Sequence, residues 1–416
     1  MKLKDIRAAG TPCGMEVKLD PKRESKPGPK ETSNLDLVPR ISTSLKIKTP
    51  ASDIHPDWAS PYAPKNVIKR LSFDEGLELL QNAPLHELGR LAKAAKEKLH
   101  PKKLTTYVVD RNINYTNICL VDCKFCAFYK HARDDGAYVL SFEQIGQKIQ
   151  ELLDIGGTQI LFQGGVHPKL KIEWYEELLS YISTNYPAIT IHGFSAVEIS
   201  YIAKISKIST LEVLMRMKAK GLFSIPGAGA EVLSDRVRDI VAPSKCSTKE
   251  WLGIHRQAHE VGLLSSATMM FGHVETDAEL IEHFDHLRNL QDITGGFRAF
   301  ILWSFQSQNT PLKKLMPHLK DASSNRYLRL LAVARLYLDN FANIQSSWVT
   351  QGSLIGQLAL EFGANDLGST MMEENVVSAA GARNRLNEEQ MKALIKDLGA
   401  RPAKRDTAYN ILEYFE

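Results

Sequence analysis

Runs of apolar and β-branched residues alternate with segments of helical spacing along most of the chain. Three of the intervening segments open with a capping box, at Ser141–Gln144, Ser247–Glu250 and Thr276–Glu279, which predicts helices that begin there. Repeated alternation of strand and helix is typical of a parallel sheet covered by helices. The runs that predict strands are 105–109, 158–162, 189–192, 222–225, 263–270, 297–303 and 343–348, with a weaker one near 361–366.

This pattern predicts an α/β fold, a TIM-like (β/α) barrel of six to eight units within residues 102–416. The same alternation could also leave the sheet open, as a doubly wound sheet. Residues 65–101 predict an N-terminal helical cap of two helices, one opened by the capping box Ser72–Glu75 and one from about Leu85 to Leu99. A helix from about Glu388 to Leu398 and the tail to Glu416 would complete or plug the barrel.

Residues 1–64 differ from the rest of the chain in composition. Nine of the 18 prolines fall here, lysine and serine are frequent, and large apolar residues are few. Such a segment buries too little apolar surface to offset the entropy lost on ordering it. We therefore expect an extended or disordered leader, and its sequence indicates no function.

The overall charge is close to balanced, with 52 basic and 48 acidic side chains and a formal net charge of +4. This argues against nucleic acid or a membrane surface as the main partner, because such proteins concentrate lysine and arginine on one face. No apolar run approaches the ~18 residues of a spanning helix, and no apolar stretch near the start indicates a signal peptide. Five cysteines in 416 residues do not make a disulfide scaffold. We therefore expect a cytoplasmic protein.

Three of the five cysteines, Cys119, Cys123 and Cys126, lie close together after the first predicted strand. Thiolates bind zinc, copper(I) or iron–sulfur clusters. A structural zinc site normally takes four protein ligands, whereas a four-iron cluster held by three thiolates keeps one iron open to a small molecule. The spacing C-x3-C-x2-C therefore favours a cluster with an open iron. Buried thiols without a metal, or zinc with a distant fourth ligand, are the alternatives.

With an aromatic residue, Phe125, before its last cysteine, this loop resembles the signature loop of radical S-adenosylmethionine (SAM) enzymes. The resemblance implies that the three cysteines hold a [4Fe-4S] cluster whose open iron binds SAM. It also implies that Phe125 lies against the adenine, that Gly164 and Gly165 meet the methionine amino group, and that Glu231 contacts the cofactor. Reduction would then cleave SAM and release a 5′-deoxyadenosyl radical, so that the cofactor carries out the difficult chemistry.

The resemblance extends from about residue 66 to the C-terminus. Over this length the chain resembles one group in particular: the radical SAM enzymes of the futalosine pathway of menaquinone biosynthesis and their deazaflavin-synthesis relatives. Within it, the chain is most similar to the members that cyclise dehypoxanthine futalosine. Aminofutalosine synthases typically have His-Pro where this chain has Phe305-Gln306, and deazaflavin relatives tend to have lysine at Thr350 or Gln351. The segments that carry the resemblance are 110–117, 269–276, 297–300, 303–306, 347–352 and 368–375.

For this group the resemblance implies ring closure within a small-molecule substrate. A hydrogen atom would leave ribose C4′ of dehypoxanthine futalosine, the carbon radical would add to the substrate's own benzoate ring, and loss of an electron and a proton would restore aromaticity. A reductant such as flavodoxin or ferredoxin would supply the electron for SAM cleavage. The alternatives are a related radical SAM enzyme, of the aminofutalosine or deazaflavin-precursor type, and a non-enzymatic protein that binds a structural metal.

A substrate with a carboxylate and sugar hydroxyls calls for arginine and for amide or hydroxyl side chains. Arg298, in the sixth predicted strand, is the candidate for the carboxylate, although a salt-bridged strand residue would look the same in the sequence. The final proton needs a base within hydrogen-bond reach, and His273, Glu275 and Glu373 are candidates. His273 could equally satisfy backbone groups in a turn. Candidates for the sugar are Gln306, Asn309, Thr350 and Gln351.

Overall fold

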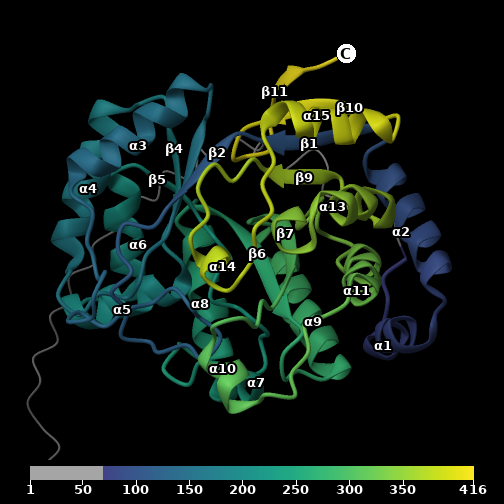
Figure 1. The fold of residues 1–416 in the computed structure, drawn as a ribbon, viewed down its shortest axis with the longest axis horizontal. Coiled ribbons are helices and arrows are strands. Elements are labelled where there is room, and N and C mark those ends of the chain that lie inside the picture. Colours follow the sequence, from purple (N-terminus) through teal and green to yellow (C-terminus); the bar gives the residue numbers. More distant parts are fainter. Residues whose placement is uncertain (1–68) are drawn as a thin grey trace, which may run out of the picture. The chain divides into compact units, whose positions relative to one another are not determined.

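The computed structural model describes residues 69–416 (Figure 1), and the predicted leader at 1–64 lies outside them. The strands are β1 Leu104–Val108, β2 Asp110–Ile113, β3 Gln159–Phe162, β4 Thr190–Gly193, β5 Leu222–Ile225, β6 Leu264–Phe271, β7 Phe297–Ser304, β8 Asn343–Gln345, β9 Asp366–Ser369, β10 Arg401–Arg405 and β11 Ile411–Tyr414. The α-helices are α1 Phe73–Asn82, α2 Leu85–Leu99, α3 Phe142–Asp154, α4 Ile172–Asn185, α5 Ala196–Ser206, α6 Thr210–Ala219, α7 Asp235–Val241, α8 Thr248–Glu260, α9 Asp277–Thr294, α10 Pro311–Leu315, α11 Ser324–Tyr337, α12 Trp348–Gln351, α13 Ser353–Ala359, α14 Val376–Ala379 and α15 Glu388–Asp397.

One bent segment, residues 104–113, closes the sheet into a barrel. β1 pairs with β9 and β2 pairs with β3, and only Val109 separates β1 from β2. The carbonyl of Val109 accepts a hydrogen bond from Thr158 N at 3.2 Å, next to β3, and the carbonyl of Val108 accepts one from Thr370 N at 3.0 Å, after β9. The segment therefore bonds to both ends of the row from β3 to β9. Counted as one strand, it completes eight parallel strands, which confirms the predicted barrel.

The chain forms three strands that the apolar pattern did not predict. β2 has the polar sequence Asp-Arg-Asn-Ile, and β10 and β11 come from the tail. β10 pairs in parallel with β1 on the side away from β9, and β11 pairs antiparallel with β10. The weaker run near 361–366 begins in a 3-10 turn, Leu360–Phe362, and the strand begins only at Asp366.

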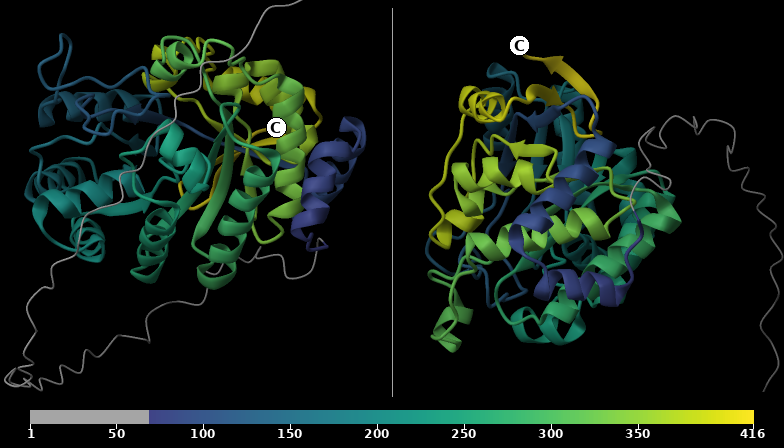
Figure 2. Two further views of the ribbon diagram at one scale, coloured as in Figure 1. Left: turned by 90° about the horizontal axis from the view of Figure 1, so that it is seen from below. Right: turned by 90° about the vertical axis from the view of Figure 1, so that its right-hand side faces the viewer.

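The predicted helix starts are confirmed, because the capping boxes that begin at Ser72, Ser141, Ser247 and Thr276 are all present. The predicted helical cap consists of α1 and α2, which contact α9 and α11 (Figure 2). This pair of helices therefore covers the outer helices of the barrel and lies on its flank. Among the described helices, none has the length and apolar character needed to cross a membrane.

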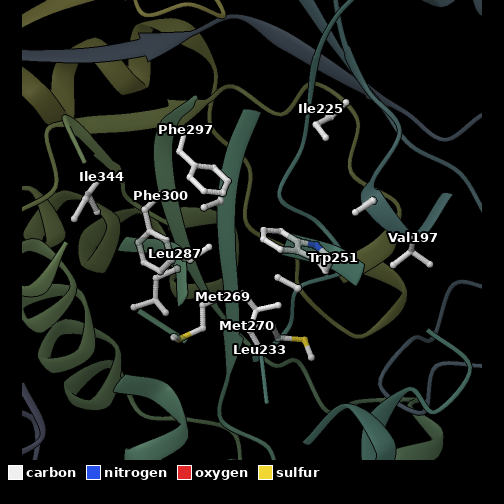
Figure 3. Packing of buried hydrophobic residues seen from close by; sticks show 14 of the residues in the cluster. Val197, Ile225, Leu233, Trp251, Met269, Met270, Leu287, Phe297, Phe300 and Ile344 are labelled. Carbon is white, nitrogen blue, oxygen red and sulfur yellow. The ribbon is translucent and has the colours of Figure 1, made fainter. Parts of the chain in front are cut away.

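Apolar side chains fill the layer between the strands and the surrounding helices (Figure 3). The rings of Phe284 on α9 and Phe300 on β7 meet edge to face with centroids 5.6 Å apart, and Phe297 lies against Trp251 of α8. Met269 of β6 is fully buried in the same cluster and fills space there. The apolar core therefore lies between the ring of strands and the outer helices, and these side chains do not fill the inside of the ring.

Candidate active site

A cavity of about 410 Å³ occupies the inside of the barrel. Its lining includes the first residues of two strands, Asp110 and Gln159, as well as loop residues beyond the carboxyl ends, such as Cys119 and Gly165. The cavity therefore reaches both ends of the strands. Layers of branched apolar side chains usually fill the interior of such a barrel. An open and partly polar interior marks a binding site.

The three cysteines lie on a loop that is fixed from three directions. Its backbone N–H groups donate to the carbonyls of Lys130 in the same loop, Val166 after β3 and Val241 at the end of α7, at 2.8–3.0 Å. All three cysteine side chains line the cavity and are free thiols. Burial raises the pKa of each thiol, and that of Cys123 to about 12, so the neutral form is favoured until a cationic ligand balances the thiolates.

Three cysteine thiolates are suitable ligands for an iron–sulfur cluster, since each thiolate that holds a cubic cluster binds a different iron. Within residues 69–416, no group of three or more histidine, cysteine, aspartate or glutamate side chains is arranged to hold a single metal ion. The three cysteines instead line one cavity, whose volume of about 410 Å³ provides room for a larger group.

The turn after β3 requires glycine at two positions. A Cβ at Gly165 would lie 2.2 Å from the carbonyl oxygen of Ile118, and one at Gly164 would lie 2.5 Å from the ring of Tyr115. Gly165 N donates to the carbonyl of Thr116 at 2.8 Å, and both glycines line the cavity. The turn therefore packs directly against the peptide that leads into the cysteine loop, and its backbone can approach a ligand closely.

A buried carboxylate that the sequence analysis did not single out, Glu198, fixes this turn. Its Oε1 accepts hydrogen bonds from Gly164 N at 2.9 Å and from the Tyr115 hydroxyl at 2.8 Å. Its Oε2 accepts from the backbone N and the hydroxyl of Ser195, both at 2.7 Å. Burial raises the pKa of Glu198, and these hydrogen bonds oppose that rise. Ser195 and Glu198 also form the capping box of α5, a signal that the sequence carried.

Glu231, predicted to contact the cofactor, lies beside a buried lysine. Lys245 forms an ion pair with Glu231, and its Nζ lies 4.8 Å from the centre of the Phe125 ring. All three side chains line the cavity. Burial favours a raised pKa for Glu231, but the positive charges of Lys245 and Arg238 outweigh it and hold the pKa below its usual value. The site therefore keeps an ionised carboxylate near the cysteines. The sequence around Lys245 gave no signal for this role.

Two of the five predicted substrate-binding residues line the cavity, and three do not. Arg298 and Thr350 belong to the lining. The amides of Gln306 and Gln351 both donate to the hydroxyl of Ser304, at 3.1 and 2.7 Å, outside the lining. Asn309 is exposed, and its amide donates to the carbonyl of Ala379 at 3.0 Å. The loop after β7 therefore directs these three amides toward other parts of the protein.

The three candidate bases also lie outside the lining. His273 Nε2 lies 3.0 Å from the carbonyl of Met270, and Glu275 accepts hydrogen bonds from the backbone N–H groups of Gly272 and His273 at 2.6 and 2.9 Å. His273 and Glu275 therefore pair with backbone groups of the turn that follows β6. The Glu373 carboxylate accepts from Arg111 and Lys148, at 2.8 and 2.7 Å. The titratable groups that do line the cavity include Asp110, His192, Glu198, Glu231 and Glu374.

Two family profiles and several curated relatives match this chain. The profile of the Radical SAM superfamily matches residues 113–287, and that of the CofH/MqnC C-terminal region matches residues 294–416. The chain is 45% identical to the cyclic dehypoxanthine futalosine synthase of Streptomyces coelicolor, over 82% of this chain and 86% of that protein. It is 38% identical to the aminodeoxyfutalosine synthase of Thermus thermophilus, over 82% and 92%. The crystal structure of methylornithine synthase (PylB) has the same fold, with a TM-score of 0.63 at 17% identity over 80% of this chain and 95% of that one.

Proposed function

Since the chain belongs to the radical SAM superfamily, and within it to the enzymes of the futalosine pathway, we propose that it converts dehypoxanthine futalosine to cyclic dehypoxanthine futalosine. The observation that carries the proposal is the 45% identity to a cyclic dehypoxanthine futalosine synthase along 86% of that protein. The identity to an aminodeoxyfutalosine synthase is lower, at 38%. The chain also has Phe305-Gln306 at the position where aminofutalosine synthases typically have His-Pro.

Enzymes of this superfamily use a [4Fe-4S] cluster and SAM. When bound, this group would supply the one-electron cleavage of SAM that yields a 5′-deoxyadenosyl radical. In this chain, Cys119, Cys123 and Cys126 would hold the cluster, because their three thiols line one space at the carboxyl end of the barrel.

The chain's own groups next to the thiols suit SAM. The backbone of Gly164 and Gly165 would take the methionine amino group, and Phe125 would lie against the adenine. The ionised Glu231 offers a carboxylate to a hydroxyl or amino group of the cofactor. Lys245 would have to release Glu231, or share it, when SAM enters. Glu198 holds the glycine turn in place from behind.

In the proposed reaction the substrate loses the hydrogen atom of ribose C4′ and forms a bond between C4′ and its own benzoate ring. The 5′-deoxyadenosyl radical would take that hydrogen atom and become 5′-deoxyadenosine. One proton and one further electron, which the oxidised cluster would accept, are then lost, and aromaticity is restored. The product is therefore two hydrogens lighter than the substrate. Thr350 and Arg298 line the cavity and offer hydrogen-bond donors there. We expect a flavodoxin or ferredoxin to be the physiological reductant.

The test is product analysis with anaerobically reconstituted enzyme, SAM, dithionite and dehypoxanthine futalosine. We expect 5′-deoxyadenosine and a product two hydrogens lighter than the substrate, in equal amounts, by liquid chromatography and mass spectrometry. Formation of 5′-deoxyadenosine without the cyclised product would favour a related radical SAM enzyme. A colourless protein that retains stoichiometric zinc and forms neither compound would favour a structural metal site.

A further inference from the structure

The end of the cavity opposite the cysteines is unusually polar. Asp110 and Gln159 begin their strands and Arg298 is the second residue of β7, so all three lie at the amino ends of the strands. Arg405, Thr407 and Tyr409 of the tail line the same cavity. We call these six residues the barrel floor. A barrel interior that served only for packing would carry branched apolar side chains at these positions.

The tail segment 405–409 crosses the floor and is bonded at both sides. Arg405 donates to the buried Asp366 of β9 at 2.6 and 3.1 Å, next to β1 (Figure 1). Thr407 donates its hydroxyl to Gln159 of β3 at 2.7 Å. These contacts confirm that the tail plugs the barrel. They also place the tail in the wall of the cavity, although it is far from the cysteines in the sequence.

Tyr409 is held under the cavity by a tight turn. Its backbone is in the left-handed region, with φ of 69°, and Asp406 stabilises the turn by accepting from the backbone N and the side-chain amide of Asn410, at 2.8 and 2.9 Å. The Arg405 guanidinium lies over the Tyr409 ring, 3.9 Å from its centre. The direction of the ring is therefore fixed by backbone and side-chain contacts that do not involve its hydroxyl.

The hydroxyl of Tyr409 and the Oδ1 of Asn112 are buried, and neither has a hydrogen-bond partner within residues 69–416. Both residues line the cavity. Buried polar atoms in folded proteins are almost always paired, so unpaired buried polar atoms in residues that line a cavity point to a ligand that supplies the partner. Burial raises the pKa of Tyr409 above its usual range, so its hydroxyl keeps the proton and can donate it.

The proposed reaction fixes which part of the substrate reaches the floor. Ribose C4′ has to lie next to the cofactor, at the cysteine end, because that is where the radical forms. The benzoate ring has to lie against C4′ to form the new bond, and its carboxylate, at the edge of the ring, would point away from the cofactor toward the opposite end of the barrel. There the lining offers hydrogen-bond donors from Tyr409 and Arg298. Asn112 is nearer the cysteines along β2, level with the sugar, whose hydroxyls can donate to its Oδ1.

We propose that Tyr409 is a substrate-binding residue whose hydroxyl donates to the carboxylate of the substrate's benzoate ring. This inference rests on the proposed function and adds to it a residue from the tail. It assigns the tail a role in substrate recognition: the residues at 405–409 close the floor and provide a donor for the anionic end of the substrate. A hydrogen bond to a carboxylate is stronger than one between neutral groups, so Tyr409 discriminates for substrates that carry this charge.

The test compares Tyr409→Phe with the wild type, because this change removes only the hydroxyl and keeps the ring over Arg405. We expect the KM for dehypoxanthine futalosine to rise about tenfold to a hundredfold with little change in kcat. The melting temperature should stay the same or rise, since the hydroxyl has no partner to lose. The methyl ester of the substrate, which lacks the charge, should be bound almost equally by both enzymes. Tyr414→Phe is the matched control, because Tyr414 is an exposed tyrosine of the same tail.

Each outcome separates this inference from the proposed function. If wild type cyclises dehypoxanthine futalosine and Tyr409→Phe has an unchanged KM, the proposed function stands and the role of Tyr409 is refuted. If the KM rises equally for the substrate and its methyl ester, Tyr409 contacts some other group and the assignment to the carboxylate is refuted. If wild type does not cyclise the substrate, the proposed function fails first and the inference fails with it.

Discussion

Replacement of Glu198 by glutamine tests whether this carboxylate holds the glycine turn. The glutamate accepts four hydrogen bonds, two at each oxygen. Glutamine has nearly the same shape but one oxygen fewer, and its amide nitrogen is a donor. Whichever way the amide turns, its NH2 group replaces one of the two carboxylate oxygens, so the two donors that bonded to that oxygen then face another donor. The Tyr115 or Ser195 hydroxyl can rotate and accept, but the backbone N–H of that pair cannot.

The expected loss follows from that one N–H group. A buried donor left without an acceptor costs about 1–3 kcal/mol, and loss of the charge on the acceptor weakens the bonds that remain. We therefore expect Glu198→Gln to lower the free energy of unfolding by about 2 kcal/mol. If the amide leaves Gly164 N unpaired, the glycine turn loosens as well, and the Kd for SAM should rise about tenfold, which corresponds to 1.4 kcal/mol.

The assay is urea unfolding of the cluster-free protein under anaerobic conditions, followed by SAM titration of the reconstituted enzyme. Glu177→Gln is the matched control, because Glu177 is an exposed residue of α4. A loss below about 0.5 kcal/mol in Glu198→Gln, with SAM affinity unchanged, would refute the reasoning, since it would mean that the four hydrogen bonds contribute no more than a surface residue does.

Three further predictions concern the cysteines, the glycine turn and a buried histidine. Cys123→Ala should bind far fewer than about four irons per chain yet keep its circular dichroism spectrum, whereas Cys246→Ala, buried but outside the cavity lining, should bind iron normally. Gly165→Ala should lower the unfolding free energy by about 1–3 kcal/mol and reduce iron binding, because its Cβ would meet backbone; Gly253→Ala, with open space around it, should not. Burial lowers the pKa of His100 to about 4, so unfolding takes up a proton below pH 6.5 and stability falls as the pH falls toward 4. His100→Gln should lose that contribution, about 1.4 kcal/mol per pH unit, and identical pH slopes would contradict it.

The fold was predictable wherever strands carry apolar runs against the outer helices. β6 and β7 pack Met269, Phe297 and Phe300 into that layer, and their sequences show it. β2 and β10 could not be found in this way. β2 is almost entirely polar because it contributes Asp110 and Asn112 to the inside of the barrel, and β10 contains a proline, which normally argues against a strand.

The same distinction between local and long-range signals applies to the candidate site. The cysteines were predictable because a short loop brings them together, so their spacing alone carries the signal. Glu198 and Tyr409 reach the cavity through strand order and through a tail that crosses the barrel; the local spacing marks Glu198 only as a helix-capping residue and does not mark Tyr409. For His273 and Glu275 the sequence was misleading. These residue types are common in catalysis, but here they stabilise a turn, because the sequence does not show which way a side chain points.

The bent segment 104–113 has a mechanical consequence for the two ends of the barrel. It is bonded on both sides at Val108 and Val109, contributes Asn112 to the cavity, and continues directly into the peptide that carries Cys119. Asn112 in the barrel interior and the first thiol therefore belong to one unbroken stretch of main chain, and the hydrogen bonds that hold its first half also limit where the cysteine loop begins.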